Sequence, residues 1–278
     1  MSEILQDLSA PELVSAFEAN LFEYGLLFRQ WDRAEVYAGS DILWILTDIA
    51  APIFNSIIRA QLSPDDVDSV IEAAIRRARS KNVPILWWTG PATHPADLGA
   101  SLQAHGFVHE VQVPGMAVDL STLNQGLPIP SGLVIEQVAE IETLRKWRHA
   151  FTTGFGMPDF MGDGFFELSS AIGFDDGSPY RNYVGFLNGE PVATSALFLA
   201  GGVAGIYNIA TVPEARQKGI GAVLTFTTMR EARNLGYKVG ILEATEMGVS
   251  LYRKLGFQEY CKINQYVWAS EHSNHEAG

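Results

Sequence analysis

The chain has 278 residues, 47% of them hydrophobic and 18% charged, which excludes wholesale disorder and allows one large domain or two of ordinary size. Its 32 acidic and 19 basic residues give a formal net charge of −13. That balance argues against a nucleic-acid partner, because phosphate binding needs an excess of Lys and Arg. The single cysteine, Cys261, excludes an internal disulfide and a cysteine-rich zinc site.

The acidic start of the chain does not resemble a signal peptide, and no apolar run is long enough to span a membrane. We therefore expect a cytoplasmic protein with no membrane partner and no metal.

Helical and extended patterns alternate through the first 120 residues. Apolar spacing predicts helices over residues 9–24, over a segment beginning at Pro64, and over 95–105. Runs rich in Ile, Leu and Trp predict strands, at 41–49, 53–62, 83–88 and 116–120. Residues 121–132, which contain two prolines and two glycines, are predicted to be a linker.

The second half is predicted to begin with a strand at 134–138, a helix at 140–152 and an irregular, glycine- and phenylalanine-rich segment at 154–178. A hairpin turned by Asn188-Gly189 follows. The remaining predicted elements are a strand at 204–212, a helix that ends at Leu235, a strand at 238–244, a short helix and a last strand at 260–268.

The two halves share local sequence. Ile53-Phe54-Asn55 corresponds to Ile206-Tyr207-Asn208, and the segment 102–107 corresponds to 252–257, at offsets of 153 and 150 residues. These nearly equal offsets predict a diverged tandem duplication.

The most informative segment is Arg216-Gln217-Lys218-Gly219-Ile220-Gly221, between a predicted strand and a predicted helix. Glycines at a helix start let a ligand approach the backbone, where free N–H groups and the helix dipole favour an anion such as pyrophosphate. A plain tight turn is the alternative. A Walker loop is excluded because Ala222-Val223 follows the last glycine, and a dinucleotide fingerprint is excluded because Leu224 stands at its third glycine position.

The same six residues match the R/Q-x-x-G-x-G/A signature of the GNAT (GCN5-related) N-acetyltransferase superfamily. Leu251-Tyr252-Arg253-Lys254-Leu255-Gly256-Phe257 is similar to that family's second characteristic segment. The resemblance extends over roughly residues 134–268. It implies an α/β protein with two GNAT-like mixed-sheet halves, of which the C-terminal one is catalytic. The expected divisions are a degenerate domain at 1–120, a linker at 121–132, a catalytic domain at 133–270 and a disordered tail at 271–278.

The resemblance implies that acetyl-CoA, or another short acyl-CoA, binds where strands 204–212 and 238–244 diverge. Its pantetheine arm would pair with the backbone of Ala210, Thr211 and Val212, and its pyrophosphate would accept hydrogen bonds from the amides of residues 217–222. The expected contacts at the loop and beyond it are Arg216, Gln217, Lys218, Gly219, Ile220, Gly221, Ala222, Thr245 and Arg253. Thr245 stands near the place where many family members carry an asparagine, so that pantetheine contact is in doubt.

Direct attack of an amine on the thioester is the implied mechanism. Tyr252 matches the tyrosine that protonates the leaving thiolate, although a ring that merely packs in a short helix would give the same residue. For the general base we expect Glu243, with water relayed by Asn208 or by the backbone as the alternative. A backbone N–H where the strands diverge would stabilise the oxyanion.

The first half lacks the matching groups. At the position of the glycine loop it has Leu62-Ser63-Pro64-Asp65-Asp66, and Leu102 replaces the tyrosine. Carboxylates repel a pyrophosphate, so we expect this half to bind no CoA and to serve as scaffold or as a wall of the acceptor site.

For the acceptor pocket we expect Phe155, Met157 and Phe160, whose apolar character suits a partly apolar substrate, although a core-facing loop would carry the same residues. Nearby carboxylates, including Asp159 and Asp163, would attract a cationic amine or simply be solvated. The expected activity is acetyl transfer to a primary amine of a small molecule. A non-catalytic acyl-CoA-binding regulator and a protein N-acetyltransferase are the alternatives, and a homodimer is left open.

Overall fold

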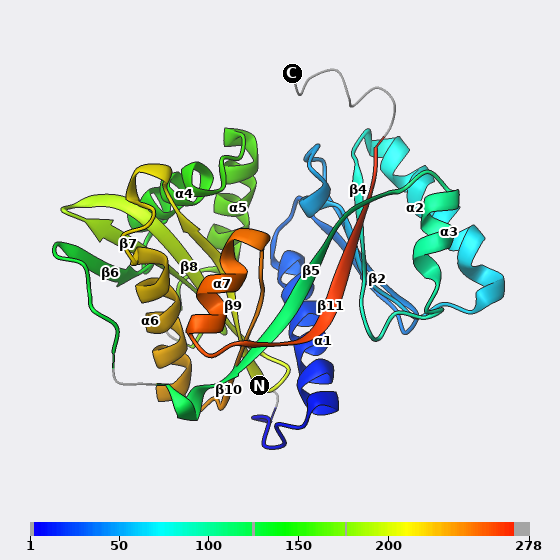
Figure 1. Cartoon of the computed structure of the whole chain (residues 1–278). Helices are drawn as coiled ribbons and strands as arrows, with labels where there is room; N and C mark the ends of the chain where they lie inside the picture. The colour runs from blue at the N-terminus through cyan, green and yellow to red at the C-terminus, as the bar shows by residue number, and fades with distance from the viewer. Residues whose placement is uncertain (1–2, 124–125, 176, 270–278) are drawn as a thin grey trace. The chain divides into compact units, whose positions relative to one another are not determined.

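The computed structural model describes residues 3–123, 126–175 and 177–269 and has the predicted α/β fold (Figure 1). Its α-helices are α1 (Ala10–Leu26), α2 (Val67–Lys81), α3 (Leu98–Ala104), α4 (Ile141–Phe155), α5 (Asp159–Ile172), α6 (Ile220–Asn234) and α7 (Glu246–Lys254). Its strands are β1 (Glu35–Ala38), β2 (Ile42–Leu46), β3 (Ser56–Ala60), β4 (Ile85–Thr89), β5 (Val108–Asp119), β6 (Leu133–Gln137), β7 (Tyr180–Leu187), β8 (Glu190–Ala200), β9 (Val203–Thr211), β10 (Val239–Glu243) and β11 (Gln258–Trp268). Short 3-10 helices are η1 (Leu27–Gln30), η2 (Pro52–Phe54), η3 (Pro64–Asp66), η4 (Leu120–Thr122) and η5 (Pro213–Ala215). The expected tail at 271–278 lies outside the described residues.

The chain divides into two compact units, each made of segments that are separate in sequence. Unit 1 comprises Met1–Asn20 and Gly115–Tyr260, and unit 2 comprises Leu21–Pro114 and Cys261–Gly278. The sequence predicts one division at the linker instead, between residues 120 and 133.

Unit 1 contains a mixed sheet in the strand order β5-β10-β9-β8-β7-β6. Only β9 and β10 are parallel; the other neighbours are antiparallel. Helices cover both faces, because successive residues of β7 contact opposite helices. Arg181 pairs with Glu231 of α6 at 3.1 Å, and Asn182 Nδ2 donates to Ser169 of α5 at 3.3 Å. The sheet therefore has an α6 face and an α5 face.

Unit 2 repeats this order on a smaller scale. Its strands β1, β2 and β3 are antiparallel neighbours, β3 and β4 are parallel, and α2 and α3 follow β3 and β4 as α6 and α7 follow β9 and β10. The core is formed by buried residues of the sheet and of both helices, including Ile57, Ile71, Trp87 and Leu102. The repeated order is the tandem arrangement that the sequence predicts.

The last strands of the two repeats are exchanged. β5 follows α3 in the chain, yet its second half pairs antiparallel with β10 of unit 1, from Gly115 opposite Glu243 to Asp119 opposite Val239. β11 follows α7, yet it pairs antiparallel with β4 of unit 2, from Asn264 to Trp268. Each unit is therefore completed by a strand that the other repeat supplies.

One segment corrects the sequence-based expectation. Residues 154–178, expected to be irregular, contain the helix α5. Their glycines serve close packing: a Cβ built at Gly162, which is buried, would overlap Thr152 Oγ1 of α4. Glycine therefore lets α5 approach α4 closely here, rather than breaking the helix.

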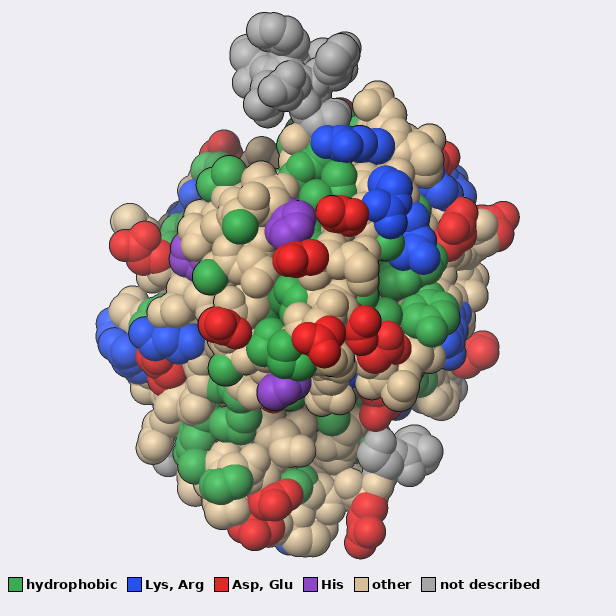
Figure 2. Space-filling model, turned by 90° about the vertical axis from the view of Figure 1, so that its right-hand side faces the viewer, with side chains coloured by type: hydrophobic (Ala, Val, Ile, Leu, Met, Phe, Trp, Pro, Cys, Tyr) green, Lys and Arg blue, Asp and Glu red, His purple; other side chains and the backbone are tan. Residues whose placement is uncertain are grey.

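Charged side chains are mixed on the face shown in Figure 2, where Lys and Arg lie in small groups among acidic and uncharged surface.

The strand exchange predicts that Trp268, ten residues before the end of the chain, stabilises unit 2. Its side chain is buried in the core of that unit, and Arg79 lies 5.3 Å from its ring centroid. Trp268→Ala should lower the free energy of unfolding by about 3–5 kcal/mol, because it leaves a large cavity. Val134→Ala, on a strand of unit 1 and 55% exposed, is the control and should change it by less than about 0.5 kcal/mol. Urea unfolding followed by tryptophan fluorescence measures both; equal effects would contradict the exchange.

Candidate active site

The parallel strands β9 and β10 separate after a short contact. Ala204 pairs with Gly240 and Gly205 with Ile241, and no further pair joins the two strands among the described residues. Beyond this point β10 continues beside β5, and β9 continues beside β8. The inner edge of β9 is therefore free of strand partners from about residue 206 onward, and an extended amide ligand can add to such an edge.

A β-bulge at Asn208 bends β9 beside this opening. Tyr207 lies opposite Ala196 and Ala210 lies opposite Thr194, so one extra residue is accommodated on β9. Asn208 has a φ of 53°; its carbonyl accepts a 2.7 Å hydrogen bond from Thr194 Oγ1, and its Nδ2 donates to the Tyr180 hydroxyl at 3.0 Å. Asn208 thus fixes the bulge and is tied to the α5 face of the sheet.

The bulge determines which backbone groups face the opening. Val212 donates its N–H to Val192 of the β8 side at 2.9 Å, so Val212 does not offer it to a ligand. Because strand residues alternate, Ala210 also faces β8, while Thr211 and Ile209 face the opening. Of the three residues expected to pair with pantetheine, only Thr211 has this orientation, and Ile209 is the residue that the sequence did not indicate.

The loop between β9 and α6 forms a cradle of backbone amides. Gln217 and Gly219 have positive φ values of 62° and 78°, and Gly219 is the N-cap of α6. Alternating left-handed residues turn successive N–H groups to one side, and the first N–H groups of a helix lack internal partners. A Cβ at Gly219 would meet nothing within 4 Å, so this glycine is required by its φ value rather than by space. The amides of residues 217–222 are therefore of the kind that binds a phosphate group.

The two cations of the loop also have local roles. Arg216 donates from Nε to the Thr211 carbonyl at 3.1 Å and from Nη2 to the Gly154 carbonyl at 2.8 Å. Lys218 Nζ donates to the Glu214 carbonyl at 2.9 Å. Arg216 thus connects the end of α4 to the end of β9. A Cβ at Gly154 would lie 2.8 Å from Ala210 Cβ, which shows how closely α4 packs there.

Tyr252 lies on the α6 face, in the core formed with Leu242 and Ala244. Its ring is buried against Phe257, with centroids 5.9 Å apart, and a Cβ at Gly248 would lie 2.6 Å from Tyr252 Cε2. Burial raises the pKa of the phenol from 10.0 to about 12, because the phenolate would lose solvation. Tyr252 therefore holds its proton at any physiological pH.

Glu243 is the last residue of β10 and lies on the opposite face. Ile241, two residues earlier, is in register with Gly205, whereas Leu242 and Ala244 face the helices of the α6 side. The Glu243 side chain is half-buried, but its Oε1 atom is buried and finds no hydrogen-bond partner among the described residues; burial raises the pKa of the carboxyl from 4.5 to about 8. A carboxyl with such a pKa can accept a proton near neutral pH.

The remaining predicted contacts lie near the ends of β10 and α7. Thr245 lies two residues after the end of β10, is exposed, and is the N-cap of α7. Arg253 is 63% exposed in its side chain and lies 4.0 Å from Glu259. Both side chains are therefore open to solvent.

The connection between α4 and α5, on the α5 face of the sheet, carries apolar side chains. Phe155 and Phe160 are 45% and 48% exposed, and Met157 is half-buried. The carboxylates expected nearby are already paired: Arg148 contacts Asp159 at 3.1 Å and Asp163 at 2.8 Å. These two residues therefore hold α4 and α5 together, which weakens the expectation that they attract a cationic amine.

In unit 2 the equivalent opening is filled by the chain itself. β3 and β4 pair only at Ser56 with Leu86 and at Ile57 with Trp87. The segment after β4 then returns to the free edge, where His94 donates its N–H to the Ala60 carbonyl and accepts the N–H of Leu62, each at 2.9 Å. These bonds occupy the backbone groups that a pantetheine arm would use.

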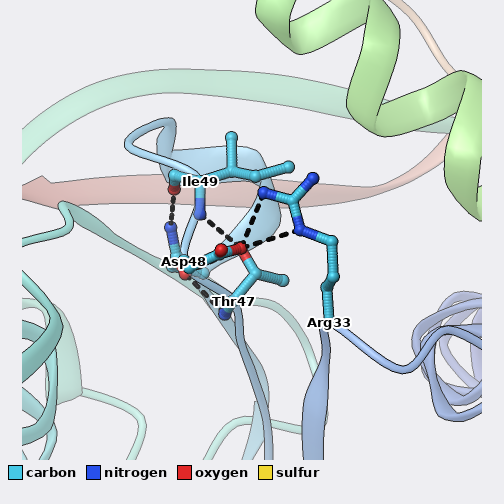
Figure 3. A network of polar contacts seen from close by, with 5 residues as sticks. Arg33, Thr47, Asp48 and Ile49 are labelled. Carbon is cyan, nitrogen blue, oxygen red and sulfur yellow. Dashed lines mark hydrogen bonds and ion pairs between the residues drawn. The ribbon is translucent and has the colours of Figure 1, made fainter.

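The predicted match of Ile53-Phe54-Asn55 to Ile206-Tyr207-Asn208 is wrong in register. Asn55 precedes β3 and its parallel pairs at Ser56 and Ile57, whereas Asn208 lies beyond the last parallel pair of β9, at Gly205. Asn55 is buried; it accepts from Thr47 N at 2.8 Å and donates to the carbonyls of Ile49 and Ala51, so it stabilises a closed turn. Figure 3 shows Thr47, Asp48 and Ile49 of this turn, with Arg33 reaching Asp48, an ion pair of 2.8 Å.

Among the described residues, no group of three or more His, Cys, Asp and Glu could hold a metal ion. In the same part of the chain, no helix is long and apolar enough to cross a membrane.

Residues 141–257 match the model of the acetyltransferase (GNAT) family. Comparison with curated protein sequences gives no match. A GCN5-related N-acetyltransferase from Kribbella flavida superposes with a TM-score of 0.69 at 18% identity, over 92% of this chain and 96% of that one. A GCN5-related N-acetyltransferase from Sphaerobacter thermophilus gives 0.62 at 13% identity, over 96% and 95%.

A tandem GNAT protein from the clavulanic acid biosynthesis pathway gives a TM-score of 0.61 at 13% identity, over 93% of both chains. At these identities the three structures show a shared fold along almost the whole chain. The match to the GNAT family model is confined to residues 141–257, from α4 to just beyond α7, whereas the shared fold extends over both units.

Proposed function

We propose that unit 1 transfers an acetyl or other short acyl group from acyl-CoA to a primary amine of a small molecule, by direct attack of the amine on the thioester. The observation that carries the proposal is the position of a half-buried carboxyl and a buried phenol on opposite faces of the sheet at one opening. Glu243, with a pKa of about 8, lies on the α5 face, and Tyr252 of α7, with a pKa of about 12, lies on the α6 face. One group can accept a proton where the other donates one.

The chain fits acyl-CoA as a substrate in two places. The amides of residues 217–222 receive the pyrophosphate at the start of α6, and the N–H groups of Ile209 and Thr211 face the opening, where they can bind the amide-rich pantetheine arm. Arg216 contributes by holding the loop to β9 and α4, and Lys218 adds charge at the surface. Thr245 and Arg253 are proposed outer contacts.

In the proposed reaction, the amine nitrogen forms a bond to the thioester carbonyl carbon, and Glu243 removes a proton from that nitrogen. A backbone N–H on the opening side of β9 stabilises the oxyanion. When the carbon–sulfur bond breaks, the Tyr252 hydroxyl gives its proton to the departing sulfur. The products are an amide and free CoA thiol, and the two protein groups regain their starting states by exchange with solvent.

The acceptor enters from the α5 face in this proposal, because Glu243 faces that side. Phe155, Met157 and Phe160 then lie on its approach, and their exposed apolar surface supports an acceptor with an apolar part. No macromolecular partner is invoked.

A non-catalytic acyl-CoA sensor would need the loop but not the carboxyl and the phenol. A protein N-acetyltransferase would use the same two groups, and the apolar connection between α4 and α5 does not distinguish a peptide from a small amine. Acetylation of amine and peptide panels separates these two acceptor classes.

We predict that acetyl-CoA binds at one molecule per chain, because His94 blocks the opening of unit 2. The double change Gly219→Asp, Gly221→Asp should abolish binding, since it places two carboxylates at the phosphate cradle and a side chain at a φ of 78°. Gly177→Asp, at an exposed glycine with open space around it, is the matched control and should bind normally. Calorimetric titration measures stoichiometry and affinity. Two molecules per chain would overturn the assignment of unit 2, and no binding by the wild type would overturn the proposed function.

The second prediction concerns Tyr252→Phe, which removes only the hydroxyl from a packed ring. Turnover should fall by about a hundredfold, the usual size of a general-acid contribution, while acetyl-CoA affinity stays within about twofold. Release of CoA thiol during single turnover and calorimetry give the two quantities. Unchanged turnover would show that the phenol transfers no proton.

The third prediction is a pH profile. Glu243 accepts a proton only when ionised, so kcat should rise with pH through a midpoint near pH 8 and level off about one to two pH units above it. Glu243→Gln should lower kcat by about 10² or more and remove this rise, while any rise caused by the amine's own ionisation remains in both enzymes.

A stability measurement checks the same group without turnover. The folded-state pKa of about 8 lies above the ordinary value of 4.5, so the folded protein holds the extra proton between these values and loses stability as pH rises through them. The Gln variant should therefore melt at a higher temperature than the wild type at pH 8.5, and equal melting would contradict the buried carboxyl.

A further inference from the structure

Asn20 of α1 is a fully buried polar residue outside the part of the chain that carries the family motifs. Its Nδ2 lies within hydrogen-bond distance of three carbonyls at the β8–β9 turn, Phe198 at 3.3 Å, Ala200 at 2.9 Å and Val203 at 3.4 Å. Its Oδ1 accepts a 2.8 Å hydrogen bond from the Tyr207 hydroxyl. One side chain from the first twenty residues thus holds both the turn that begins β9 and an aromatic ring on β9.

Tyr207 stands at the point where the sheet of unit 1 opens. Gly205 of β9 and Ile241 of β10 form the last parallel pair. Tyr207 lies two residues beyond Gly205, and Glu243 lies two residues beyond Ile241. Tyr207 and Glu243 are therefore at equivalent register positions on the two diverging strands, and both belong to the α5 face.

The ring of Tyr207 lies along β9, over Gly205, instead of projecting away from the sheet. A Cβ built at Gly205 would overlap Tyr207 Cε2 and Asn20 Oδ1, so the missing side chain at Gly205 is what makes room for the ring. The hydroxyl is held by Asn20, and the ring remains half-buried. Its position is fixed from both ends, by the backbone of β9 and by α1.

We propose that Tyr207 is a specificity-determining residue that forms the wall of the acceptor site across the opening from Glu243, and that Asn20 is its positioning residue. This inference rests on the proposed function. The ring face is suited to an alkylammonium group, which is attracted to an aromatic face. The ammonium gives one proton to solvent to form the free amine, and Glu243 removes the second proton when the nitrogen attacks. The substrate class is therefore a primary alkylamine that presents its ammonium group and its first methylenes to the ring.

The test uses the full-length chain with acetyl-CoA and the best acceptor found among 2-phenylethylamine, tyramine and spermidine. Tyr207→Phe keeps the ring and removes its bond to Asn20. The KM of the amine should rise about tenfold, while kcat and the KM of acetyl-CoA stay within about twofold, because the acceptor wall alone loses its fixed position.

The matched control is Ser195→Ala. It removes a buried hydrogen bond of the same length, 2.8 Å to Thr228, on the α6 face of the neighbouring strand. A similar drop in melting temperature is expected for both variants, with no change in amine KM for the control. If Tyr207→Phe changes only the melting temperature, or raises the KM of acetyl-CoA instead, the inference is overturned and the proposed function stands. If the wild type acetylates none of the three amines, the proposed function fails, and this inference fails with it.

Discussion

The early end of pairing between β9 and β10 is the constraint on which the rest of unit 1 depends. Two parallel strands that pair at only two positions leave a free backbone edge inside a sheet, where unsatisfied N–H and C=O groups are costly unless a ligand or water satisfies them. The bulge at Asn208, the amide cradle before α6 and the acids on either face all surround this one interruption. The proposed reaction is placed there because the interrupted sheet itself supplies hydrogen-bond donors.

Unit 2 shows what the same topology does without that opening. Its parallel pair also ends after two positions, but His94 returns to bond with Ala60 and Leu62, and Asn55 is fully occupied within a closed turn. The two repeats have the same order of helices and strands. They differ in the group that hydrogen-bonds to the backbone of β3 or β9 where its parallel partner ends. A single returning segment is sufficient to convert a candidate binding edge into a structural one.

Local chemistry explains which parts of this protein could be predicted from the sequence. The glycines of the cradle, the hairpin turn and the helical position of Tyr252 depend on neighbouring residues, so their patterns are visible in the chain. The helix α5 is not evident from the sequence, because its glycines are typical of a loop. In the structure, Gly162 instead allows close packing against Thr152. The bonds of Arg216 to Gly154 and of Asn20 to Tyr207 join residues 62 and 187 positions apart, and only the folded chain brings these groups together.

The exchange of β5 and β11 has a consequence for how the protein is made. On the ribosome, residues 21–114 emerge well before β11, the strand that pairs with β4. Until β11 has been synthesised, β4 presents an unpaired edge, the kind of surface that associates with other chains. Folding of unit 2 must therefore wait for β11. A chaperone that shields one edge strand during that interval would protect the whole molecule from aggregation.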